Sequence, residues 1–117
     1  MATWSADELA TAVLQRLGVV AVGQTAPSEW SNWVSKRWTS IYRYLRRMEV
    51  APWPIGEIDE EAQEPLEKYV AGKLYSKWGI TGPREITIKA DAREGWEDLK
   101  SLAAADKTAN PVQVPYY

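Results

Sequence analysis

Apolar residues in the first part of the chain recur at the spacing of an α-helix. They occupy every fourth position from Leu9 to Leu17, which places them on one helical face. Ser5 and Glu8 have the spacing of a capping box, and Gly18 is typical of a helix C-terminus. The pattern therefore predicts a helix over about residues 6–17.

The longest amphipathic pattern covers residues 28–48. At 100° per residue, one side of this helix is apolar and rich in aromatic residues. Its members are Trp30, Trp33, Val34, Trp38, Ile41, Leu45 and Met48. The opposite side carries a basic face, which consists of Lys36, Arg43, Arg46 and Arg47. Charged helix faces are often merely solvated, so both solvation and a binding role remain open for this face.

Two further helices follow. One has apolar residues from Leu66 to Trp78 and ends at Gly79, provided that Pro65 lies near its first turn, where a missing N–H is tolerated. The last helix covers about 86–103. Its first residues also suit a strand, and Gly95 weakens the helical pattern. Tyr75 falls on the far side of the third helix.

Two segments are predicted to be extended rather than helical. Residues 19–23 are short, apolar and bounded by glycine, which predicts a buried extended connector. Residues 107–117 contain two prolines and alternate apolar side chains at period two, which indicates an extended tail. The fold prediction is thus all-α, a small bundle of about four helices in one domain over 1–106, followed by an extended C-terminal arm over 107–117.

The arm is a candidate docking segment. Its relevant residues are Val112, Val114, Pro115, Tyr116 and Tyr117. Prolines restrict the unfolded chain, and alternate side chains suit pockets in a partner, as in strand addition or groove binding. The alternative is a frayed terminus, which is common at chain ends.

Two features precede the third helix. Trp53 lies between two prolines, which predicts an interface residue on a stiff, extended corner. An acidic run follows, comprising Glu57, Asp59, Glu60, Glu61 and Glu64. Carboxylates at a helix start favour the helix dipole, which alone explains them. The same run is a candidate acidic lateral face for contact with a neighbouring subunit.

The amino-acid composition restricts the classes of function that the protein can have. The chain of 117 residues has 14 Lys and Arg against 16 Asp and Glu, and neither His nor Cys. It thus lacks the commonest general base, metal ligand and thiol nucleophile. We predict a protein that is not an enzyme and has no cofactor or metal. No signal peptide or apolar stretch of membrane-spanning length occurs, so no membrane is expected. Seven Trp and six Tyr favour interfaces, although a small core also uses such residues.

The ordered motifs resemble the small helical head-to-tail connector, or adaptor, proteins of tailed bacteriophages and gene transfer agents. The resembling segments are Leu14-Gln15-Arg16-Leu17-Gly18-Val19, Gly23-Gln24-Thr25-Ala26-Pro27-Ser28, Val50-Ala51-Pro52-Trp53-Pro54-Ile55, Ile58-Asp59-Glu60-Glu61-Ala62 and Val112-Gln113-Val114-Pro115-Tyr116-Tyr117. They span nearly the full chain. The richness of residues 28–48 in Trp and Arg departs from the family's pattern.

This resemblance implies a structural virion protein at the head-tail interface, assembled in the host cytoplasm. Such a protein binds the portal protein, forms a ring of about twelve copies that continues the DNA channel, and receives tail or nozzle proteins. The family's C-terminal arm clasps the portal, which corresponds here to Val112, Val114, Tyr116 and Tyr117.

The basic face has two possible partners in such a ring. It contacts either the acidic lateral face of a neighbouring copy or packaged DNA, through phosphates and without sequence preference. The competing interpretation is a small helical DNA-binding regulatory module that uses the basic face of helix 28–48. The net charge of −2 argues against that module.

Overall fold

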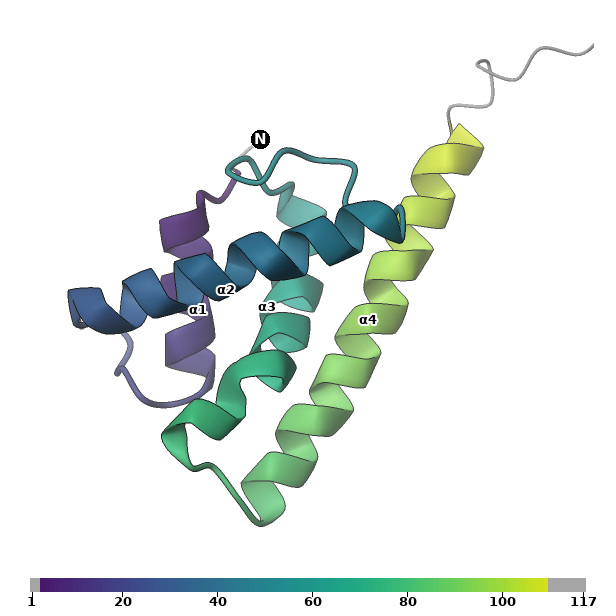
Figure 1. The fold of residues 1–117 in the computed structure, drawn as a ribbon. Coiled ribbons are helices and arrows are strands. Elements are labelled where there is room, and N and C mark those ends of the chain that lie inside the picture. The colour runs from purple at the N-terminus through teal and green to yellow at the C-terminus, as the bar shows by residue number, and fades with distance from the viewer. Residues whose placement is uncertain (1–2, 110–117) are drawn as a thin grey trace, which may run out of the picture.

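The computed structural model describes residues 3–109, with side chains described as far as residue 105. Its elements are α1 (Ala6–Arg16), α2 (Ser28–Arg47), α3 (Glu60–Leu74), the 3₁₀ turn η1 (Tyr75–Trp78) and α4 (Pro83–Ala109). Over this part of the chain the only β-type pairing is an isolated bridge between Trp4 and Ile58. The predicted all-α bundle is confirmed. Figure 1 shows α2 lying across α1, α3 and α4.

The start of α1 is fixed by the capping box that the sequence predicts. The Ser5 hydroxyl accepts a hydrogen bond from the Glu8 N–H at 3.2 Å, and the Ser5 N–H donates to the Glu8 carboxylate at 3.1 Å. Two N–H groups at the helix start are thereby satisfied. Trp4 and Ile58 exchange backbone hydrogen bonds of 3.0 Å, so the capped end of α1 is also tied to the segment before α3.

Replacing Ser5 by alanine should lower the free energy of unfolding by about 1 kcal/mol, because the Glu8 N–H loses its acceptor. Urea unfolding followed by circular dichroism measures this change. Ser28→Ala is the matched control, since α2 begins without a side-chain cap and an exposed substitution there should stay within about 0.5 kcal/mol. Equal losses at both positions would show that the capping box adds no stability.

The apolar side of α2 contributes to the core through three fully buried side chains, Val34, Trp38 and Leu45. Trp30 and Trp33 are partly buried against Trp78 of η1, with ring centroids 6.3 and 5.5 Å apart. The predicted apolar face is therefore observed over most of its length. Met48 departs from it, because this residue caps the C-terminus of α2 and is 47% exposed.

The hairpin of α3 and α4 depends on two close approaches between the helices. A Cβ atom on Gly72 would lie 2.2 Å from the Cβ of Ala92, and one on Gly95 would lie 2.4 Å from the Pro65 carbonyl oxygen. Gly95 therefore does not interrupt α4 but allows it to pack against α3. Pro65 lies in the second turn of α3, directly after the first turn, and α3 begins within the predicted acidic run.

Other local predictions are wrong in instructive ways. Residues 19–23 form turns and bends, and Val22 is 86% exposed while Val20 is buried. Positive φ angles at Gly18 and Gly23 bend this segment, so it cannot extend. By contrast, the start of the predicted last helix is confirmed, because residues 86–88 are helical. Tyr75 packs against the core, because the chain tightens to 3₁₀ winding there, which rotates the side chain.

The C-terminal end of α4 stands beyond the other helices (Figure 1). The helix reaches Ala109, so residues 107–109 are helical and not extended as predicted. Residues 110–117, which include the proposed docking residues Val112, Val114, Pro115, Tyr116 and Tyr117, lie outside the described residues. Within the described range, every helix is too short or too polar to cross a membrane.

Candidate interaction surfaces

The predicted basic face lies on the exposed side of α2. Lys36, Arg43 and Arg47 are exposed, and within residues 3–109 none of them forms an ion pair. Arg46 has a different environment, since it donates a 3.0 Å hydrogen bond to the Ala51 carbonyl and lies over the Tyr42 ring at 5.9 Å. Arg46 therefore also holds the segment that follows α2.

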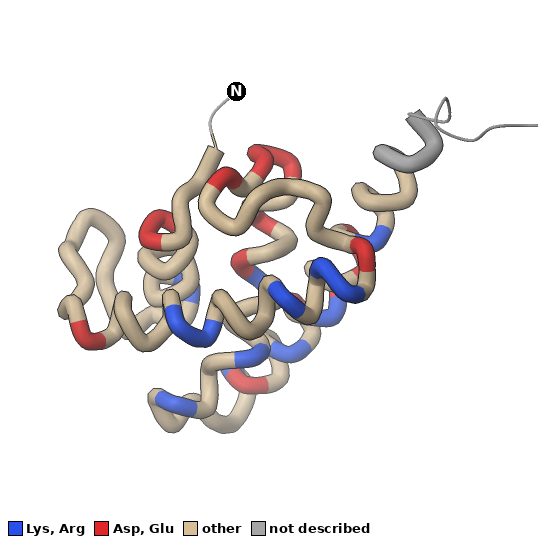
Figure 2. Tube along the Cα trace, turned by 45° about the horizontal axis from the view of Figure 1, so that its top comes forward, with Lys and Arg blue, Asp and Glu red and all other residues tan. Residues whose placement is uncertain are grey.

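The predicted acidic lateral face lies around the start of α3. Glu57, Asp59, Glu60 and Glu61 are all exposed, and none of them has an ion-pair partner among the described residues. Glu64 is also exposed, but it pairs with Lys68 at 3.6 Å. Figure 2 shows acidic residues at the start of α3 and basic residues along α2 and below it. The two charges thus occupy separate surfaces.

Trp53 is not an exposed corner, because it is 5% exposed and part of the core. Its ring stacks on Trp38 with centroids 6.2 Å apart, and its carbonyl accepts a 2.8 Å hydrogen bond from the Tyr42 hydroxyl. The Trp38 indole N–H donates to the Ile55 carbonyl at 3.2 Å. These contacts pull the proline-rich segment inward over α2, so the predicted interface role of Trp53 is wrong.

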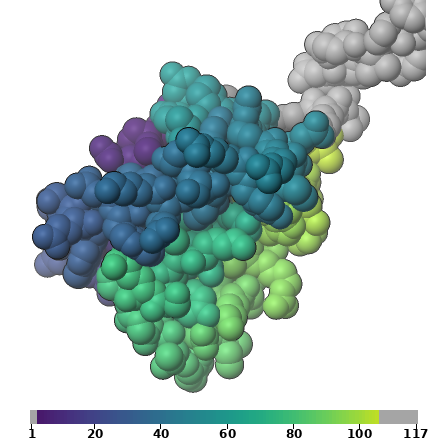
Figure 3. All heavy atoms as spheres, viewed as in Figure 1, coloured from purple at the N-terminus to yellow at the C-terminus, as the bar shows by residue number. Residues whose placement is uncertain are grey.

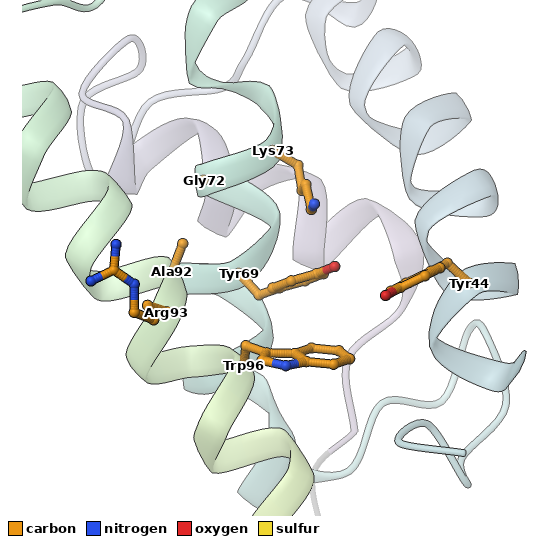
Figure 4. A pocket seen from close by; sticks show the side chains of 7 residues that line it. All are labelled: Tyr44, Tyr69, Gly72, Lys73, Ala92, Arg93 and Trp96. Carbon is orange, nitrogen blue, oxygen red and sulfur yellow. The ribbon is translucent and has the colours of Figure 1, made fainter. Parts of the chain in front are cut away.

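A hollow that the sequence did not predict lies where α2, α3 and α4 meet (Figure 4). It has a volume of about 340 Å³ and is lined by Tyr44, Tyr69, Gly72, Lys73, Ala92, Arg93 and Trp96. Trp96 stacks on Tyr69 with centroids 5.3 Å apart, and Tyr44 lies 6.1 Å from Trp96 at a tilt of 33°. Three aromatic rings and Lys73 therefore come together here from three helices. The Arg93 side chain extends away from the rings at the edge of the hollow (Figure 4).

A second hollow shares Lys73 with the first and continues it along α2. Its volume is about 480 Å³, and its lining includes Trp33, Arg37 and Lys77. Arg37 and Lys77 lie over the Trp33 ring, 5.1 and 4.7 Å from its centroid. We call the two hollows together the basic-aromatic groove. Figure 3 shows the blue atoms of α2 crossing the molecule, with the green atoms that follow in the chain lying below them.

The groove keeps its positive charge. Among the described residues, Arg37, Lys73, Lys77 and Arg93 form no ion pair, and neither hollow is lined by a carboxylate. The cations that do pair with carboxylates are Arg16, Lys68, Lys89 and Lys100. Unpaired cations in a concave surface attract anions from solution. The groove therefore suits an anionic partner.

The buried tyrosine of the groove, Tyr69, does not oppose this charge. Burial raises the pKa of the Tyr69 phenol above its usual value, and the nearby Tyr44 phenol raises this pKa further. Tyr69 therefore stays neutral at physiological pH and remains able to donate a hydrogen bond.

The groove was missed because its residues come from separate helices. On α2, Trp33, Arg37 and Tyr44 follow one another at intervals of four and seven residues, which places them on one ridge. This ridge adjoins the predicted basic face, and its alternation of aromatic and basic residues was the available signal. Its pairing with Lys73 and Arg93 depends on how α2 crosses the α3–α4 hairpin.

The described residues contain no group of three or more acidic side chains placed to hold a metal ion. In comparisons with protein-family models, curated proteins and solved structures, nothing matches this chain.

Proposed function

We propose that this protein is a non-catalytic structural protein of a virion, a head-to-tail adaptor that binds the portal vertex and forms a ring continuing the DNA channel. The ring would provide the attachment surface for tail or nozzle proteins. The observation that carries the proposal is the separation of unpaired charge on one small body. Exposed carboxylates gather at the start of α3, and exposed cations gather along α2.

Opposite charges on separate surfaces suit head-to-tail contact between identical copies. A ring requires two different patches on each subunit, because its contacts are heterologous. Lys36, Arg43 and Arg47 supply one patch, and the acidic lateral face supplies the other. Pairing them would satisfy charges that have no partner within the described chain, while like-charged faces would repel each other and fix the direction of assembly.

The end of α4 supports portal docking. This helix carries the chain beyond the bundle (Figure 1), and the apolar residues of the proposed arm follow it directly in sequence. The proposed arm itself lies outside the described residues. We propose that it binds the portal through alternate side chains.

The test of adaptor function is the mass of the portal ring encoded by the same genome, measured with and without this protein. Twelve copies of the 13.2 kDa chain would add about 158 kDa. A variant that lacks residues 110–117 should keep its helicity and lose portal binding. An unchanged portal mass with the full chain would refute the adaptor proposal, and full binding by the shortened chain would refute the role of the arm.

Reversing charge on the basic face tests the ring contact. The double variant Arg43→Glu and Arg47→Glu should abolish assembly on the portal, because it places carboxylates opposite the acidic lateral face. Adding Glu60→Lys and Glu61→Lys should restore assembly. Glu29→Lys is a control, since it changes an exposed charge near the other end of α2. Native mass spectrometry reports copy number, and an unaffected ring in the double variant would contradict this contact.

The exposed cations of α2 also support a second candidate function, that of a regulatory module that binds duplex DNA with the basic face. Such a module would bind duplex DNA at moderate salt and leave the portal ring unchanged in mass. The two measurements thus separate the candidates.

A further inference from the structure

We propose that the basic-aromatic groove binds single-stranded nucleic acid. Bases would stack on Tyr44 and Trp96, while Arg37, Lys73, Lys77 and Arg93 neutralise phosphates. The proposal does not depend on portal binding or ring formation, because the residues of the groove differ from those of the arm, the acidic lateral face and the outward basic face.

The first support is the arrangement of cations around aromatic rings. Lys73 lies 5.4 Å from the Tyr69 ring centroid, and Arg37 and Lys77 flank Trp33. A cation above a ring retains its full charge, because the ring supplies no counterion. These cations have no carboxylate partner among the described residues, so each of them could form an ion pair with a phosphate.

The second support is the accessible aromatic surface beside these cations. Tyr44 is 45% exposed, and Figure 4 shows it facing Tyr69 and Trp96 across the groove. Tyr69 is buried and supports Trp96 from one side by stacking. Trp96 is thereby held in a fixed orientation, and the Lys100 ammonium lies over its ring, 5.7 Å from the centroid. The Trp96 side chain remains partly accessible. Rings fixed beside a positive groove are the combination that single-strand binding proteins use.

The aromatic residues favour a single strand over the other anionic polymers. An acidic peptide would satisfy the cations but would have no base to place on Tyr44 and Trp96. A duplex would present phosphates, but its bases remain stacked on one another and cannot reach the rings without unpairing. Unpaired bases can use both kinds of contact. The two hollows, which both have Lys73 in their lining, would together accommodate such a strand.

The experiment is fluorescence anisotropy of a labelled oligothymidine of about twelve nucleotides, titrated with the full chain at several salt concentrations. Four cations that each neutralise one phosphate give a log–log salt slope of about −3. Lys73→Gln with Arg93→Gln should weaken binding and reduce this slope by about half. Lys68→Gln with Lys89→Gln is the charge-matched control, because both lysines pair with carboxylates and lie outside both hollows. This control should leave the slope unchanged.

The aromatic contribution is tested at Tyr44. Tyr44→Ala should weaken binding about tenfold without changing the salt slope, and Tyr44→Phe, which retains the ring, should restore affinity. Circular dichroism confirms that each variant is folded. If Tyr44→Ala binds as tightly as the unaltered chain, or if oligoglutamate or duplex DNA of equal charge binds as well as oligothymidine, the proposal is overturned.

Discussion

Replacing Trp38 by alanine should lower the free energy of unfolding by about 4 kcal/mol. Trp38 is fully buried, and it stacks on Trp53 while its indole N–H donates to the Ile55 carbonyl. Alanine would leave a large cavity between α2 and the segment before α3, and the Ile55 carbonyl would lose its donor. Chemical denaturation followed by circular dichroism measures the loss without relying on tryptophan emission.

Two further variants separate the parts of this effect. Trp38→Phe retains a ring but loses the donor to Ile55, so its loss should be clearly smaller, about 1–2 kcal/mol. Ile86→Ala removes an apolar side chain that is 70% exposed, and it should change stability by less than about 0.5 kcal/mol. A loss at Trp38→Ala no larger than that at Ile86→Ala would show that the stacked pair does not stabilise the bundle.

Helical periodicity predicted most of the fold, because each helix buries a face that recurs every three or four residues. The predicted apolar side of α2 contains the buried residues Val34, Trp38 and Leu45. The capping box of α1 could also be predicted from the sequence, since it depends on residues three positions apart. Local signals of this kind need no knowledge of tertiary packing.

The errors concern residues whose positions depend on distant parts of the chain. Two prolines gave Trp53 an extended backbone, but contacts with Trp38 and Tyr42 decide that its ring points inward. Gly95 looks like a weak point within a helix, yet it lies against the backbone of α3. Neither fact can be read from local propensity, because both arise from how separate helices pack.

The charged surfaces also divide into those that depend on local sequence and those that depend on how helices pack. The basic face and the acidic lateral face were predicted as groups, because neighbouring residues on one helix or in one run share a surface. The groove was not, because Tyr44 meets Lys73 and Trp96 only when α2 crosses α3 and α4. Surfaces confined to one helix can therefore be predicted from this sequence, whereas those built from several helices require the fold.

The close approach of α3 and α4 makes Gly72→Ala the other substitution with a large expected effect. Alanine usually stabilises a helix interior relative to glycine by about 0.5–1 kcal/mol. Here the added Cβ would lie 2.2 Å from the Cβ of Ala92, a distance that forces the two helices apart. Overpacking of this kind should outweigh the helical gain, and we expect a net loss of about 2 kcal/mol, measured by urea unfolding.

A compensating substitution on α4 distinguishes a clash from a general effect of the added methyl group. Ala92→Gly removes the opposing Cβ, so the double variant with Gly72→Ala should recover most of the lost stability, because the methyl group is merely transferred between helices. Gly56→Ala is the control, since a Cβ there would meet no atom within 4 Å and should be neutral or slightly stabilising. If the double variant is no more stable than Gly72→Ala alone, the contact with Ala92 is not what sets the distance between α3 and α4.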